Sequence, residues 1–101
     1  MNNIKNQINE ILKEMNEITE LLYQQKSKEG YVLLNGTLGK IMILMDTISK
    51  IKTEKEHLFD IERLNNNLKA ALDAMEIKDN VMLADILNYE IAEQLKESIN
   101  L

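Results

Sequence analysis

The chain has no cysteine, no proline and no tryptophan, and only three of its 101 residues are glycine. The lack of cysteine excludes a disulfide scaffold, a cysteine-bearing zinc finger and a thiol-based catalyst. The lack of proline and the scarcity of glycine disfavour a β-sheet domain, because such a domain needs turn residues at short intervals. The composition therefore predicts an all-α fold.

The charge and the hydropathy of the chain disfavour two further classes of protein, nucleic-acid-binding proteins and membrane proteins. Seventeen acidic residues outnumber twelve basic ones, which gives a net charge of −5. Because nucleic-acid binding needs a clustered basic surface, we expect no nucleic-acid partner. We also expect no membrane span, because no apolar run approaches the ~18 residues that a span needs. The polar start of the chain, Met-Asn-Asn-Ile-Lys, lacks the apolar core of a signal peptide and favours a cytoplasmic location.

Four segments of similar length show the helical spacing of apolar residues. They cover residues 2–27, 31–52, 54–76 and 80–99. In the first two, apolar residues recur at alternating intervals of four and three, which is typical of a coiled-coil seam. A chain of this length forms one domain. We therefore predict an antiparallel three- or four-helix bundle with coiled-coil-like seams over residues 1–101.

Local signals mark the expected helix boundaries. Gly30 is predicted to supply a left-handed turn between the first two helices, and Asp79 to cap the last helix. Thr53 and Glu56 have the spacing of a capping box, which favours a helix start at this point. The alternative is one long helix over residues 31–76, because no glycine or proline breaks its second half.

The second segment is apolar on nearly all sides between Lys40 and Asp46. Such a helix is either the central helix of the monomer or part of a subunit interface. The residues predicted to line a partner-binding groove or a dimer seam are Leu34, Leu38, Met42 and Met45. If these residues are exposed, they indicate a surface that binds a partner. If they are buried, they belong to the core of the monomer. Because so small a chain buries a limited share of its surface, we expect a twofold-symmetric homodimer.

No catalytic constellation is evident. The only histidine is His57, and no serine lies in a nucleophile motif that could work with it. The three glycines lack the spacing of a phosphate-binding loop. Glu54 and His57 match the i, i+3 ligand pair of di-iron helical bundles, so they are weak metal-site candidates. They fall in an expected interhelix turn, which favours an ordinary surface histidine. We therefore expect no cofactor and no enzymatic activity.

The stretch from Asp79 to Glu90 is the most distinctive part of the sequence. Asp85 and Tyr89 lie four residues apart, so they share one side of a helix. A tyrosine hydroxyl beside carboxylates can bind a lysine or arginine of a partner. It can equally order the helix through an internal hydrogen bond, which is the favoured interpretation.

The C-terminal third, LKAALDAMEIKDNVMLADILNYEIAEQLKE over residues 68–97, resembles small uncharacterised helical proteins of low-GC Gram-positive bacteria. Those proteins end in a similar D-x-V-x-L-A-D-x-L-x-Y-E phrase. Some are associated with motility gene neighbourhoods, so the resemblance implies a cytoplasmic accessory role and no established activity. We therefore predict a non-enzymatic adaptor or chaperone-like module that binds a partner helix. The alternatives are a metal-binding helical-bundle enzyme and a structural coiled-coil spacer.

Overall fold

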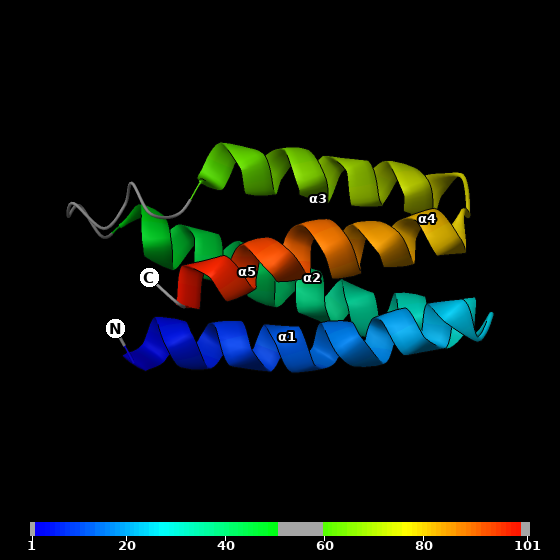
Figure 1. Ribbon diagram of the computed structural model, residues 1–101, viewed down its shortest axis with the longest axis horizontal. Coiled ribbons are helices and arrows are strands. Elements are labelled where there is room, and N and C mark those ends of the chain that lie inside the picture. The colour runs from blue at the N-terminus through cyan, green and yellow to red at the C-terminus, as the bar shows by residue number, and fades with distance from the viewer. Residues whose placement is uncertain (1, 51–59, 100–101) are drawn as a thin grey trace.

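A computed structural model of the chain describes residues 2–50 and 60–99. In this part of the chain, four helical rods run alternately in opposite directions and pack into a bundle (Figure 1). The bundle measures 42 × 22 × 20 Å. The prediction of an all-α antiparallel bundle is therefore confirmed, with four rods rather than three.

The elements of the four rods lie within a few residues of the expected segments, except that the third rod begins at Ile61, seven residues after the expected start at 54. The first three rods are α1 (Asn2–Tyr23), α2 (Ser27–Ser49) and α3 (Ile61–Glu76). The fourth rod is a continuous helical path of α4 (Asn80–Asp85), a π-helical turn η2 (Ile86–Ile91) and α5 (Ala92–Ile99). Because α2 ends at Ser49 and α3 begins at Ile61, the alternative of one helix over residues 31–76 is wrong. The capping box expected at Thr53 and Glu56 lies outside the described residues.

The first helix, α1, packs against two of the other rods. It contacts α2 on one side and all three elements of the fourth rod on the other. Its fully buried residues follow the seam expected from the sequence, and they are Ile8, Ile11, Met15, Ile18 and Leu22. The third rod, α3, packs mainly on α4 and η2. An aliphatic core thus joins the rods, and α1 and the fourth rod both contribute long rows of buried side chains.

The turn between α1 and α2 differs from the sequence-based expectation. Gln25, rather than Gly30, adopts the left-handed backbone conformation, with φ of 63°. Lys26 N donates to Leu21 O at 2.8 Å and Gln25 N donates to Leu22 O at 3.1 Å, a pair of bonds that commonly closes a helix. Gly30 lies in the first turn of α2, where it is buried against Leu22. Because glycine has no side chain, α1 and α2 can approach closely at this position. The prediction that Gly30 supplies the left-handed turn is therefore wrong.

The turn between α3 and α4 repeats the same geometry. Lys78 has φ of 59°, Asp79 N donates to Ala74 O at 3.0 Å, and Lys78 N donates to Met75 O at 3.1 Å. The carboxylate of Asp79 then accepts a hydrogen bond from Met82 N at 3.0 Å. The prediction that Asp79 caps the last helical rod is therefore confirmed.

Loss of this cap should measurably weaken the fold. We expect Asp79→Ala to lower the free energy of unfolding by about 1 kcal/mol, because the Met82 N–H loses its acceptor. Urea unfolding measures the change. The control is Asp73→Ala, which removes an exposed carboxylate of α3 that caps no helix. Equal losses in the two variants would contradict the capping role.

Glycine at the two left-handed positions should strengthen the fold. Left-handed backbone costs a residue with a Cβ atom about 1 kcal/mol, and glycine avoids this cost. We therefore expect Gln25→Gly and Lys78→Gly each to raise the free energy of unfolding by ~0.5–1 kcal/mol. Thermal unfolding followed by circular dichroism tests this. Gln24→Gly is the control, because the φ of Gln24 is not positive, and a gain there would show that relief of left-handed backbone is not the cause.

Candidate functional site

The residues of α2 that were predicted to form a groove or a dimer seam lie in different environments. Leu34 is buried in the core, Leu38 and Met45 are half-buried, and Met42 is exposed. Leu34 therefore packs inside the monomer and does not line an open surface. The exposed large apolar side chains of α2 are Val32, Met42 and Ile43.

The outer face of α2, which we define as Val32, Gly36, Gly39 and Ile43, is open. These residues are spaced four, three and four apart, so they lie on one side of the helix. Apart from the chain neighbours and the backbone of α2 itself, no heavy atom of the described residues lies within 4 Å of the position that a Cβ atom would occupy at Gly36 or Gly39. Each glycine inside a helix costs ~1 kcal/mol relative to alanine, and packing within the bundle does not account for this cost. The outer face of α2 is therefore narrow, partly apolar and accessible to another helix.

Among the described helices, α2 is long and apolar enough to cross a membrane by length and composition alone. The expectation of no membrane span stays a prediction, because length and composition alone do not decide it. The core helix of a soluble bundle passes the same test, and α2 has buried residues such as Ile41 and Leu44 along one side. Its midpoint also carries Lys40, whose ammonium group is paired with carboxylates of α1.

A polar cluster joins α1 to α2 around Lys40. Its ammonium group donates to Glu10 Oε1 at 2.8 Å and pairs with Glu14, and the buried hydroxyl of Thr37 donates to Glu14 Oε1 at 2.6 Å. Burial raises the pKa of Glu14, but the hydrogen bonds from Lys40 and Thr37 outweigh burial and hold this pKa below its usual value. The members of the cluster satisfy one another, which is typical of a structural contact.

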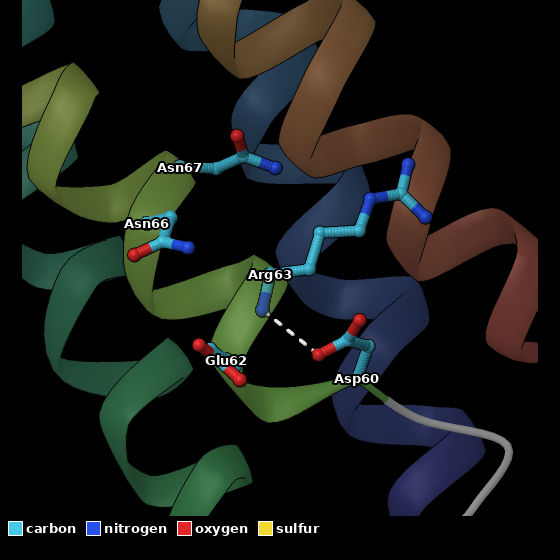
Figure 2. Close-up of a pocket in the computed structure, with 5 residues that line it drawn as sticks. All are labelled: Asp60, Glu62, Arg63, Asn66 and Asn67. Carbon is cyan, nitrogen blue, oxygen red and sulfur yellow. Dashed lines mark hydrogen bonds between the residues drawn. The ribbon is translucent and has the colours of Figure 1, made fainter.

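An open polar pocket of about 310 Å³ lies at the start of α3 (Figure 2). Its lining residues are Asp60, Glu62, Arg63, Asn66 and Asn67. Asp60 caps α3 by accepting a hydrogen bond from Arg63 N at 2.9 Å. The guanidinium group of Arg63 extends toward the fourth rod, where its Nη1 donates to Glu97 Oε2 at 3.1 Å. Asp60 and Arg63 thus start α3 and attach it to α5, which are structural roles.

Metal-binding residues do not gather in the described part of the chain. Within residues 2–50 and 60–99, no group of three or more histidine, cysteine, aspartate or glutamate side chains is placed to hold a metal ion. Glu54 and His57 lie outside these ranges, so the structure gives no position for that candidate pair.

The two other predicted site residues, Asp85 and Tyr89, lie on the fourth rod beside the end of α1. Tyr23 of α1 donates its hydroxyl to Asp85 Oδ1 at 2.5 Å. Tyr89 lies near Tyr23 and is exposed. Asp85 therefore receives its hydrogen bond from a residue 62 positions earlier in the chain. Sequence reasoning missed Tyr23, because nothing in the local pattern links α1 to this position.

We call the surface formed by Tyr23, Met82, Asp85 and Tyr89 the tyrosine site. Apart from Asp85, its members are large apolar or aromatic side chains that remain exposed. Among the described residues, no lysine, arginine or histidine forms an ion pair with Asp85. The tyrosine site therefore combines a carboxylate, aromatic rings and a methionine on one open surface.

The π-helical turn η2 begins directly after Asp85 and contains Tyr89. Ala92 N donates to Leu87 O, five residues earlier, which widens the helix by one residue in this turn. Leu87 and Ile91 stay buried while Tyr89 points outward. Turns of this kind are frequent at functional sites, because the extra residue redirects nearby side chains. The π turn therefore sets how Tyr89 is presented beside Asp85.

The hydrogen bond to Asp85 has a measurable consequence at high pH. This bond, burial and the charge of Asp85 raise the pKa of Tyr23 to about 12. A pKa above the unfolded value of about 10 means that the stabilisation is complete below pH ~10 and is lost as the pH rises toward 12. We expect wild type to be slightly more stable than Tyr23→Phe at pH 8, with the difference vanishing near pH 12. Denaturant unfolding at several pH values checks this, and a constant difference would contradict it.

These features define a small antiparallel four-helix-bundle protein with an open tyrosine-flanked carboxylate. Residues 1–100 match a family described as a domain of unknown function (DUF8042), and the chain belongs to this family. No curated protein and no solved structure matches the chain. The family match extends over nearly the whole chain.

Proposed function

We propose that this chain is a non-enzymatic interaction module that forms a homodimer and binds a helix of another protein. The observation that carries the proposal is the exposure of Val32, Met42 and Ile43 on α2, at 70%, 67% and 63%. The opposite side of α2 already supplies the core, so these side chains contribute little to packing of the monomer. Exposed apolar surface of this kind is typical of protein interfaces.

A second copy of the chain fits the outer face of α2. The spacing of four, three and four is symmetric about a midpoint between Thr37 and Leu38. When two copies pair antiparallel about a twofold axis at this midpoint, Gly36 meets Gly39 of the second copy and Val32 meets Ile43. The glycines let the two backbones approach, while the larger side chains close the ends of the contact. The face is therefore complementary to itself.

The tyrosine site lies on α1 and the fourth rod and shares no residue with the outer face of α2, so we expect it to stay available in this dimer. This supports an adaptor or chaperone-like role in which a dimer presents two partner-binding surfaces. The resemblance of the C-terminal third to cytoplasmic bacterial proteins, some from motility gene neighbourhoods, supports an accessory role in the bacterial cytoplasm.

Sedimentation equilibrium tests the dimer. Wild type is expected to show twice the mass of one chain at high micromolar concentration, and Ile43→Glu is expected to be monomeric. The matched control is Leu72→Glu, which places the same charge on a half-exposed leucine of α3 and should leave the dimer intact. A monomeric wild type at about 100 μM, or equal effects of both variants, would refute the dimer.

Disulfide cross-linking tests its orientation, because the chain has no native cysteine. In the antiparallel pair, a mixture of Val32→Cys and Ile43→Cys chains should form a mixed disulfide readily. Val32→Cys alone should not cross-link, because its two thiols would be separated by eleven residues, or ~16 Å along the helix. The reverse pattern would indicate a parallel pair.

A further inference from the structure

The carboxylate of Asp85 lacks a cation within the described bundle. Its hydrogen bond from the Tyr23 hydroxyl uses Oδ1 and adds no positive charge. The chain as a whole carries a net charge of −5, so its overall field also favours a cationic partner. A lysine or arginine supplied by another molecule is the electrostatic complement of this surface.

The surroundings of Asp85 fit the rest of such a side chain. Tyr23, Met82 and Tyr89 are 43%, 49% and 62% exposed. Aromatic faces attract ammonium and guanidinium groups, and the flexible thioether of methionine adapts to apolar surface of varied shape. The alkyl stem of lysine or arginine packs on apolar surface while its charged end meets a carboxylate. The site thus offers a contact for both the stem and the charged end.

Two features hold the site in shape before any partner arrives. The hydrogen bond from Tyr23 fixes Asp85 from a neighbouring helix, and the π turn fixes the presentation of Tyr89. A surface that is ordered in advance loses less conformational freedom on binding. Both features adjoin Asp85: the hydrogen bond ends at its carboxylate, and the π turn begins at the next residue.

The geometry points to the tyrosine site as the docking surface for a basic amphipathic helix, with a lysine or arginine of that helix bound to Asp85. Apolar side chains one turn before and after the basic residue then pack on Met82, Tyr23 and Tyr89. This inference rests on the proposed function as a partner-binding module and specifies the chemistry of the partner.

Selection from a phage-displayed library of amphipathic helical peptides tests the inference. Wild type should enrich peptides that carry lysine or arginine flanked by apolar residues at helical spacing. Fluorescence anisotropy with an enriched peptide should show at least tenfold weaker binding to Asp85→Asn, and weaker binding to wild type at higher salt. No enrichment, enrichment of peptides without a basic residue, or unchanged binding by Asp85→Asn would each overturn the inference.

Three controls test whether peptide binding depends on the tyrosine site in particular. Asp73→Asn removes an exposed carboxylate of α3 and should leave peptide binding unchanged. The monomeric Ile43→Glu variant should bind the enriched peptide as wild type does, so failure of the dimer and failure of the tyrosine site are distinguishable. Sedimentation with phosphatidylcholine vesicles should show no binding of the protein. Asp85-dependent binding to these vesicles would instead assign the site to a choline headgroup and would overturn the inference.

Discussion

Replacement of Ile18 by alanine is expected to lower the free energy of unfolding by about 2–5 kcal/mol. Ile18 is fully buried in α1, the helix that contacts both α2 and the fourth rod. Truncation removes apolar contacts and leaves a cavity that the surrounding helices cannot close completely. Because domains of this size are stable by only ~5–15 kcal/mol, the loss is a large share of the total.

Thermal and urea unfolding of Ile18→Ala both measure this effect. The melting temperature should fall by roughly 10 °C or more, given about 4–8 °C per kcal/mol for domains of up to 100 residues. The control is Leu72→Ala in α3, where the leucine is half exposed and the loss should stay below ~1 kcal/mol. Comparable losses at the two positions would contradict the full burial of Ile18.

The second large effect is expected from enlargement of Gly30. A Cβ atom at this position lies 3.1 Å from Leu22 Cδ2 and 3.6 Å from Leu21 Cβ. The longer side chain of Gly30→Leu therefore has to push α1 and α2 apart or displace Leu22 from the core. Overpacking of this kind costs ~1–3 kcal/mol, and the better helix propensity of leucine offsets only part of it.

Gly36→Leu is the matched comparison, because the same substitution there enters open space. It should raise the free energy of unfolding by up to about 1 kcal/mol through helix propensity alone. Both substitutions are best measured in the Ile43→Glu background, in which self-association is not expected to contribute. If Gly30→Leu were as stable as Gly36→Leu, the close contact between α1 and α2 would be disproved.

The sequence was sufficient to predict the features that depend on local spacing. The row from Ile8 to Leu22 was predictable because burial of one helix face requires apolar residues every three or four positions. The cap at Asp79 was predictable because a short acidic side chain before a helix accepts a hydrogen bond from its first turn. Neither feature depends on a distant part of the chain.

Features that depend on tertiary contacts were not predictable in the same way. A glycine near a helix break suits both a left-handed turn and a close helix contact, and Gly30 adopts the second role. The pattern showed that α2 is apolar on several sides, but only the packed bundle shows that Leu34 faces inward while Ile43 faces outward. The hydrogen bond from Tyr23 to Asp85 joins residues 62 positions apart, so no local sequence pattern predicts it.

The contacts of α1 and α3 with the fourth rod also set the order in which the bundle can assemble during synthesis. As the chain leaves the ribosome, α1 can pair with α2 before its other partner, the fourth rod, is translated. The third rod, α3, packs mainly on that same later segment and gains its main support only when residues 80–99 emerge. Because the tyrosine site is shared by α1 and the fourth rod, a nascent chain presents no complete site. The docking proposed for the tyrosine site therefore requires a chain in which the fourth rod has been made and has packed on α1.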